Sequence, residues 1–380
     1  MLTKTAGPVT LPSDHHRHRG CGRNARMRPL TFTPLAVSLP FRICLMTPEP
    51  SSSSSPEATI DALPVLDLRD HASSDAATRE AFLTQLTQSL ETFGFLVLDG
   101  HGIDPQRFAA AFAESAAFFQ LDEADKQACS VPESLGNRGY VGLGGEKAVG
   151  ARAADLKEFF HVGQPNPRGA AGSFGNAWPA APQLAGFQNT MLGLFAELEQ
   201  LASRVLAAVE EAIGLEAGSL QDWIDGGNSI LRLIHYPPLP AERPGDAVRA
   251  AAHADINLIT LLCEGTAGGL EVQRPDGSWL PVSALAGQLV VNVGDMLQLA
   301  TAGRLKSTPH RVVNPADPAA RVVSRYSMPF FVHPRSEVVL SHDASGPITA
   351  GSFLAARLAA IRSPHDAPPA FADPPSLPSC

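Results

Sequence analysis

Several features that mark common protein classes are absent from this sequence. Its 380 residues contain five scattered cysteines and no CxxC pair, which argues against a disulfide framework or a thiolate zinc site and predicts a cytoplasmic protein. It has no run of about 18 apolar residues, so we expect neither a transmembrane helix nor a membrane partner. The P-loop, GxGxxG, GxSxG and HExxH motifs are also missing, which disfavours the usual nucleotide-binding, serine-hydrolase and zinc-hydrolase chemistries.

Charge is distributed unevenly along the chain. The net charge is −9, yet residues 1–45 carry seven basic residues and a single acidic one, so the remainder is strongly acidic. An acidic body repels phosphate backbones, and we therefore expect no nucleic-acid partner. The basic segment belongs to a predicted disordered extension, residues 1–58, which contains five consecutive serines. Met46 is an alternative start of the chain, in which case the preceding segment is an error of the gene model.

The first ordered region is predicted to span residues 59–182. Apolar residues at helical spacing predict helices at Ala77–Phe93 and Asp104–Phe119, with a strand at Phe95–Leu98 between them. Residues 130–182 are rich in Gly, Pro and Ala, which predicts long loops. We expect this region to supply helices, edge strands of a barrel and binding loops.

The second region, residues 183–362, is predicted to start with a long helix and continue as a β-rich core. The helical pattern covers Gln183–Leu215 and is expected to break or bend near Gly193. Short β-rich runs separated by turn signals follow, as expected of a sandwich or barrel. These runs are Leu231–Tyr236, Val248–His253, Leu258–Leu262, Leu270–Gln273, Leu289–Val293, His310–Val313 and Val322–Val332. A closing helix at Ala350–Ile361 precedes a tail, residues 363–380.

The most informative pattern is a histidine and an aspartate two residues apart, followed by a distant histidine. His253 and Asp255 lie in a β-rich run, and side chains at i and i+2 of a strand project from one face. His310, 57 residues after His253, completes the set from a second run. Two imidazoles and one carboxylate leave three octahedral positions open, as in non-haem Fe(II) oxygenases, whereas zinc more often takes a closed tetrahedral set. Such a pair also arises by chance among ordinary core or surface residues.

A second pair lies in an apolar, strand-like run. Arg325 and Ser327 share one face of this run, 15 residues beyond His310. A buried arginine without a partner is costly, and its planar guanidinium suits bidentate binding of a carboxylate. The pair therefore indicates either a carboxylate ligand or an internal ion pair with an Asp or Glu of the chain.

Together these residues give the chain a specific resemblance. The pattern resembles the isopenicillin N synthase-like family of Fe(II)/2-oxoglutarate-dependent oxygenases through His253-x-Asp255, His310, Arg325-x-Ser327 and Tyr236-Pro237-Pro238. The resemblance covers roughly residues 60–361, in phrases such as LPVLDL, GFLVLDGHGI, DLKEF, HADINLITLL, VVNVGDML, LKSTPHRVV and RYSMPFFVHP.

The resemblance implies a double-stranded β-helix, or jelly-roll, core with flanking helices. It implies that Fe(II) is held by His253, Asp255 and His310, with no catalytic residue beyond these ligands. It further implies that 2-oxoglutarate is the co-substrate, bound through its distal carboxylate by Arg325 and Ser327 with a hydroxyl from Tyr236. The expected reaction uses O₂ to oxidise a small organic substrate by hydroxylation, desaturation or cyclisation, and releases succinate and CO₂. The protein would orient these molecules and exclude water.

Four further residues are candidates for the site. Asn292 either contacts the co-substrate or caps a turn. Arg232 lies four residues before Tyr236 on the same strand face, so its side chain is a candidate for reaching the pocket. Arg138 and Tyr140 either contact the substrate or brace a loop.

Two other functions remain open at this stage. In isopenicillin N synthase itself the same motifs serve without 2-oxoglutarate, and the RxS pair binds the carboxylate of the substrate. Ile234 also stands where plant members of the family often carry an Asn that helps to hold 2-oxoglutarate. The remaining alternative is a non-catalytic binding protein on the same fold. The sequence predicts neither the individual substrate nor the oligomeric state.

Overall fold

The computed structural model describes most of the chain between Ala62 and Arg362. The described residues are 62–134, 136–146, 154–168, 174–239, 247–263 and 265–362. The predictions for the extension at residues 1–58, for a start at Met46 and for the tail at residues 363–380 lie outside the described residues.

The largest element is an eight-stranded mixed sheet. In spatial order its strands are β1 (Val65–Asp67), β2 (Phe95–Asp99), β10 (Leu289–Val293), β7 (Ile259–Cys263), β12 (Arg325–Val332), β5 (Ile230–Tyr236), β4 (Glu158–Gly163) and β3 (Gly139–Val141). The pair of β1 and β2 is parallel, and the other neighbours are antiparallel.

A four-stranded antiparallel sheet packs against one face of this large sheet. Its spatial order is β6 (Ala250–His253), β11 (His310–Val312), β8 (Leu270–Gln273) and β9 (Trp279–Pro281). Alternation along β2 shows how the faces divide: Phe95 and Val97 join a buried cluster with Val272 and Leu280 of the small sheet, whereas Leu96 turns to the helices. Two sheets that face each other in this way, neither closed into a barrel, form the expected sandwich.

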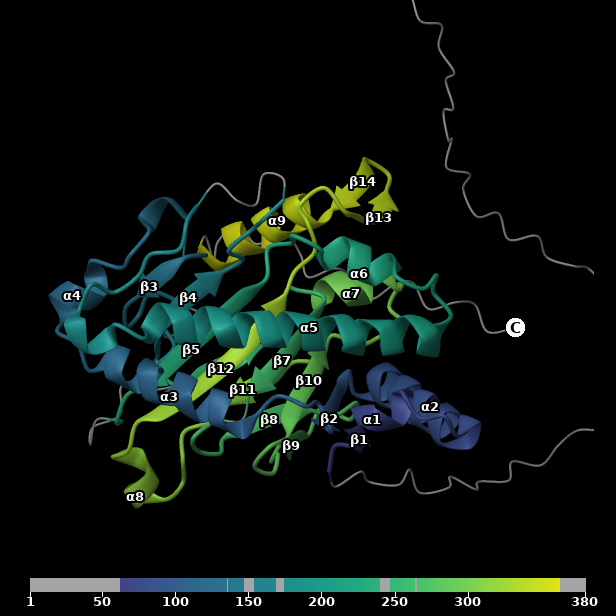
Figure 1. Cartoon of the computed structure of the whole chain (residues 1–380), viewed down its shortest axis with the longest axis horizontal. Coiled ribbons are helices and arrows are strands. Elements are labelled where there is room, and N and C mark those ends of the chain that lie inside the picture. The colour runs from purple at the N-terminus through teal and green to yellow at the C-terminus, as the bar shows by residue number, and fades with distance from the viewer. Residues whose placement is uncertain are drawn as a thin grey trace, which may run out of the picture. The chain divides into compact units, whose positions relative to one another are not determined.

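The described residues also form nine helices, of which the longest three pack over the other face of the large sheet. They are α1 (Leu68–His71), α2 (Ala76–Thr92), α3 (Pro105–Phe119), α4 (Glu123–Gln127), α5 (Phe187–Ile213), α6 (Ser219–Ile224), α7 (Asp295–Ala300), α8 (Pro318–Arg321) and α9 (Ala350–Arg362), with 3-10 turns η1 (Pro132–Ser134) and η3 (Pro182–Leu184). Figure 1 shows α5 lying across the strands, with α2 and α3 beside it. A hairpin of β13 (Val339–Asp343) and β14 (Gly346–Thr349) precedes α9. None of the described helices is long and apolar enough to cross a bilayer.

The long helix differs from the sequence-based expectation. α5 runs without a break for 27 residues and includes Gly193, so the predicted break is wrong. A glycine inside a helix costs only about 1 kcal/mol relative to alanine. Met191 and Leu194, on either side, are fully buried in the core, and this packing outweighs the local cost.

Residues 130–182 also differ from the expectation, since they contain two strands of the large sheet. β4 pairs with β5 along its whole length and is buried at every position, so the prediction of continuous loops is wrong there. Both of its faces are covered, and such a strand reads as a short apolar run rather than an alternating one. Likewise, the strand expected from Val322 begins only at Arg325, because Pro318–Arg321 forms a helical turn.

Candidate active site

His253 and His310 lie opposite each other on neighbouring strands of the small sheet. His253 ends β6, His310 begins β11, and their ring centroids are 4.5 Å apart. Asp255 follows two residues after β6, with its Oδ1 3.7 Å from His310 Nε2. One ligand atom from each residue lies within 4.8 Å of the others, and no other such group of His, Cys, Asp or Glu occurs among the described residues. The fold therefore brings all three predicted ligands to one point.

Backbone carbonyls orient the two imidazoles. His253 Nδ1 lies 2.8 Å from the carbonyl oxygen of Ala251, and His310 Nδ1 lies 3.3 Å from that of Thr308. A carbonyl oxygen can only accept a hydrogen bond, so each Nδ1 carries the proton and donates it. In the neutral imidazole this leaves the lone pair on Nε2, which is the form of histidine that binds a metal.

The Asp255 carboxylate is held through only one of its oxygens. Thr260 Oγ1 donates to Oδ2 at 2.6 Å, and Asn292 Nδ2 donates to the same oxygen at 2.8 Å. Thr260 and Asn292 are register partners on β7 and β10. Asn292 therefore supports Asp255, a contact that the sequence-based alternatives for Asn292 did not include. These hydrogen bonds orient the carboxylate while leaving Oδ1 directed at His310.

The protonation states suit a divalent cation. Burial, followed by repulsion from His310, lowers the pKa of His253 to about 4, so this imidazole is neutral at neutral pH. Burial by itself raises the pKa of Asp255, but the neighbouring histidines and the hydrogen bonds from Asn292 and Thr260 outweigh it, and the net shift is downward. Neutral imidazole nitrogen and ionised carboxylate oxygen are the donor types of a non-haem Fe(II) site.

The second predicted group lies on adjacent strands of the large sheet. Arg325, which begins β12, faces Tyr236, which ends β5, and the guanidinium carbon is 5.0 Å from the centre of the tyrosine ring. Ser327 is the register partner of Ile234. Arg325, Ser327 and Tyr236 are each only 3% exposed. Tyr236 and Ile234 belong to an apolar cluster with Ala250, which lies three residues before His253.

Arg325 has no acidic partner among the described residues, although it is buried. Its Nε donates to the carbonyl oxygen of Ala267 at 2.8 Å, while its Nη1 has no hydrogen-bond partner. A Cβ on Gly265 would lie 2.7 Å from Nη2, so this glycine allows the guanidinium to occupy its position. The Arg325–Ser327 pair was expected to indicate either an internal ion pair or a carboxylate ligand. Arg325 has no internal ion pair among the described residues, so its buried guanidinium is available to a carboxylate ligand.

A second buried arginine near this group was not found by sequence reasoning. Arg249 directly precedes β6, is 1% exposed and has no ion-pair partner among the described residues. Its Nε lacks any hydrogen-bond partner. Burial and then repulsion from Arg325 lower its pKa. The only sequence signal was a basic residue within an otherwise alanine-rich strand, which also fits an exposed edge position.

Arg232 is close to the site but already paired. It donates from Nη1 and Nη2 to Glu146 at 3.1 and 3.2 Å and from Nε to His161. Its guanidinium lies 4.3 Å from the ring centre of Phe159 and 5.2 Å from that of Phe331. Its charge is thus balanced by a carboxylate and covered by two aromatic rings.

Arg138 and Tyr140 make contacts that brace β3 and its loop. Arg138 donates to the Asn137 carbonyl and to Asn228 Oδ1, and its guanidinium lies where a Cβ on Gly163 would be. Tyr140 donates its hydroxyl to Glu158 and is 3% exposed. These contacts match the bracing alternative for both residues, although Arg138 Nε has no hydrogen-bond partner.

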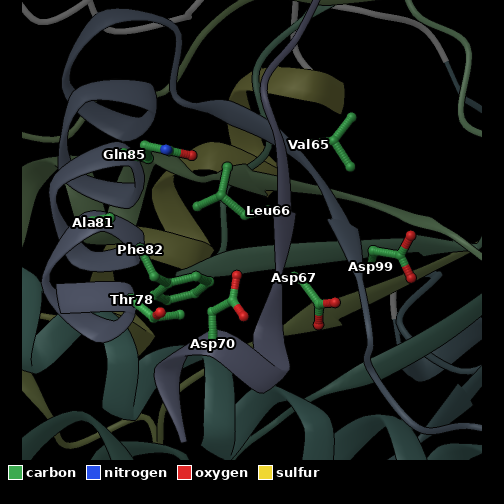
Figure 2. Close-up of a pocket in the computed structure, with 9 residues that line it drawn as sticks. All are labelled: Val65, Leu66, Asp67, Asp70, Thr78, Ala81, Phe82, Gln85 and Asp99. Atoms are coloured by element: carbon green, nitrogen blue, oxygen red, sulfur yellow. The ribbon is translucent and has the colours of Figure 1, made fainter. Parts of the chain in front are cut away.

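A separate cavity of about 370 Å³ lies at the edge of the large sheet. Figure 2 shows it between α2 and β1, with carboxylates from β1, α1 and the end of β2 at its rim. Its lining is Val65, Leu66, Asp67, Asp70, Thr78, Ala81, Phe82, Gln85 and Asp99. None of the predicted site residues is among them.

Two family comparisons match this arrangement. Residues 63–181 match the N-terminal family described as non-haem dioxygenase in morphine synthesis, and residues 227–334 match the 2OG-Fe(II) oxygenase superfamily. The second match contains all three residues of the triad, Arg325 and Arg249.

Curated proteins and solved structures agree with the family matches. The chain is 33% identical to the 2-oxoglutarate-dependent dioxygenase frbA of a Dothideomycetidae species, covering 73% of this chain and 88% of that protein. It resembles the crystal structure of a full-length Neurospora crassa protein in complex with alpha-KG at a TM-score of 0.70 and 30% identity, covering 78% and 96% of the two chains. A 2OG-Fe(II) oxygenase family protein from Caulobacter crescentus is 39% identical, with a TM-score of 0.68 and coverage of 80% and 100%.

These relatives confirm the expected jelly-roll fold and the expected dependence on Fe(II), 2-oxoglutarate and O₂. The chain belongs to the 2OG-Fe(II) oxygenase superfamily and is a 2-oxoglutarate-dependent dioxygenase.

Proposed function

We propose that His253, Asp255 and His310 are the iron ligands of this enzyme. The observation that carries the proposal is the convergence of one imidazole nitrogen from each histidine and one carboxylate oxygen within 4.8 Å. The carbonyls behind the imidazoles and the donors on Asp255 Oδ2 fix all three side chains before a metal arrives. A metal held by these three residues would keep coordination positions for the co-substrate and O₂.

We propose that Arg325, Ser327 and Tyr236 hold the distal carboxylate of 2-oxoglutarate. Arg325 brings a buried guanidinium with an unused Nη1, and Tyr236 and Ser327 bring hydroxyl groups on neighbouring strands. Iron, 2-oxoglutarate and O₂ together supply the oxidising chemistry, and succinate and CO₂ are released. Tyr236 also belongs to a buried apolar cluster with Phe159, Ile234, Ala250 and Val312, and such surroundings would keep water away from a bound carboxylate.

We propose that the substrate is a small organic molecule and that it is hydroxylated, desaturated or cyclised. Crystal structures of the related Neurospora crassa protein contain thymine and 5-formyluracil, which are small molecules of this kind. The acidic charge of the chain beyond residue 45 disfavours a nucleic-acid partner. We propose that the protein is cytosolic, because Cys129 and Cys263 are free, buried thiols and the cytosol keeps thiols reduced.

An anaerobic optical titration tests the ligand assignment. Fe(II)-loaded protein is titrated with 2-oxoglutarate, and the metal-to-ligand charge-transfer band of the chelate is followed. We expect the band to saturate at one equivalent and to be lost in His253→Ala, Asp255→Ala and His310→Ala while circular dichroism stays unchanged. Iron binding and an undiminished band in any of these variants would refute the assignment of that residue. Iron binding without a band in the wild-type protein would instead support the isopenicillin N synthase-type mechanism, with Arg325 and Ser327 holding the substrate.

A further inference from the structure

Arg249 is a fully buried cation whose charge nothing in the described chain balances. Its side chain makes no hydrogen bond or ion pair there, and its Nε is enclosed without a partner. Only its backbone is anchored, through the amide hydrogen donated to Asn314 Oδ1 at 3.2 Å. An ionised side chain taken out of water without a counter-charge is strongly unfavourable, so a residue in this state requires a reason.

The position of Arg249 supplies the reason. The next residue, Ala250, packs with Tyr236 and Ile234, and these two residues face Arg325 and Ser327 on the neighbouring strand. After burial, repulsion from Arg325 is the next cause that lowers the pKa of Arg249, which agrees with the two guanidinium groups lying near each other. Two guanidinium groups, both buried and both without an acidic partner in the described chain, therefore lie beside Tyr236 and Ile234.

Other arginines that are at least partly buried show that this arrangement is unusual within the described chain. Arg232 has Glu146, and Arg311 has Glu271 and the ring of Trp279. Arg138 lacks a carboxylate but donates two hydrogen bonds to neutral oxygens. Arg249 has neither kind of partner among the described residues, and its neighbour Arg325 has a single carbonyl.

We propose that Arg249 is a second cationic ligand for the distal carboxylate of 2-oxoglutarate, which it shares with Arg325. The inference rests on the proposed role of the Arg325 pocket and goes beyond the RxS motif. A carboxylate placed between the two guanidinium groups would neutralise their repulsion and occupy the orphaned Nε and Nη1 atoms. Because both guanidinium groups attract a carboxylate and an apolar chain end would leave them without a counter-charge, the site selects a dicarboxylic co-substrate over a 2-oxo acid with an apolar end.

Binding to the metal-free protein tests this role without catalysis. Isothermal titration and thermal shift are measured with 2-oxoglutarate, with glutarate, and with 2-oxopentanoate, which lacks the distal carboxylate. For wild-type protein we expect binding of 2-oxoglutarate and glutarate and little binding of 2-oxopentanoate. For Arg249→Met we expect the affinity for both dicarboxylates to fall about tenfold or more, with Fe(II) affinity unchanged; tenfold corresponds to about 1.4 kcal/mol.

Two further variants separate the possible outcomes. Arg249→Lys keeps the charge and is expected to retain part of the preference for dicarboxylates, and it replaces the methionine variant if that does not fold. Arg311→Met, a control with a paired arginine on β11, is expected to bind as wild type does. Suppose that Arg325→Met loses dicarboxylate binding while Arg249→Met, or Arg249→Lys if only that variant folds, binds dicarboxylates within twofold of wild type. This result would overturn the role of Arg249 and leave the proposed role of Arg325 intact. Absence of 2-oxoglutarate binding to wild-type protein, with or without iron, would instead contradict the proposed function.

Discussion

Two buried groups of charge lie close together in this molecule and differ in one respect. In the group of Glu146, Asp155, Lys157 and Arg232, every charge meets an opposite charge within the described chain. In the group of Arg249 and Arg325, neither charge does so. The paired group stabilises the fold around β4 and β5, whereas the unpaired group is the one that we propose to bind a ligand. We therefore expect the pairing of buried charges to distinguish residues that support the structure from residues that bind a ligand.

Within the triad, the Asp255 side chain has one oxygen with hydrogen-bond partners and one without. Asp255 Oδ2 accepts two hydrogen bonds from Thr260 and Asn292, and Oδ1 is left facing the histidines. The satisfied oxygen orients the carboxylate, and the unsatisfied oxygen is available to the metal. The same distinction between satisfied and unsatisfied polar atoms therefore holds at the iron site.

The largest effect is expected where a paired charge loses its partner. Lys157 Nζ lies 2.7 Å from Glu146 and 2.8 Å from Asp155, and all three groups are largely buried. We expect Lys157→Met to lower the free energy of unfolding by about 3–5 kcal/mol, because it leaves buried carboxylates uncompensated. Urea unfolding measures this. The control Arg304→Met breaks an exposed pair with Glu91 and should cost about 1 kcal/mol or less. Equal losses in both variants would contradict the distinction.

A paired carboxylate on β4 predicts the acid sensitivity of the fold. Burial by itself raises the pKa of Glu158, but hydrogen bonds from His235, Lys126 and Tyr140 lower it to about 2. A lowered pKa means that the ionised form contributes stability above the ordinary value near 4.5, and this contribution is lost as the pH falls towards 2. We expect it to amount to about 3 kcal/mol at neutral pH.

Urea unfolding at pH 6, 4.5 and 3 checks this contribution. The stability difference between wild type and Glu158→Gln should stay constant from pH 6 to pH 4.5 and shrink below pH 4.5. A difference that does not change with pH would show that Glu158 contributes through packing alone.

A smaller effect is expected at the satisfied oxygen of Asp255. Thr260→Val keeps the shape of the side chain and removes the 2.6 Å hydrogen bond to Oδ2. We expect the affinity for Fe(II) to fall by about 10- to 100-fold with little change in fold, as for other residues that orient a metal ligand. Competition with a chelator measures the affinity. Thr87→Val, which removes a hydroxyl that bonds backbone carbonyls on α2 and α5, is the matched control. Equal iron affinity in both variants would exclude the orienting role.

The part of the site that sequence reasoning found is the part encoded at short range. His253 and Asp255 are two residues apart, as are Arg325 and Ser327, and strand periodicity alone predicts that each pair shares a face. The support of Asp255 by Asn292 depends on the register between β7 and β10, which no local pattern specifies. Arg249 was missed because its significance lies in what surrounds it, namely burial beside a second arginine and the lack of a counter-charge in the described chain.

The fold shows the same limit. Strands that lie in the β-rich half, such as β8 and β10, were predicted with their observed bounds. β4 was missed because its neighbourhood is rich in Gly, Pro and Ala and because both of its faces are buried. Its place beside β5 is a tertiary contact between segments about 70 residues apart, and it positions Phe159 and His161 opposite Ile234 and Arg232.

The stability of Arg325→Met with and without 2-oxoglutarate tests the central claim most directly. In metal-free protein without ligand, replacing an unpaired buried charge by an apolar side chain should leave the free energy of unfolding unchanged or raise it slightly. With 2-oxoglutarate at about 100 times its dissociation constant, wild type should gain about 2.7 kcal/mol and the variant almost nothing, so that wild type becomes the more stable protein. A variant that is already several kcal/mol less stable without ligand, by a margin that 2-oxoglutarate does not change, would contradict the claim that these arginines are kept for a ligand.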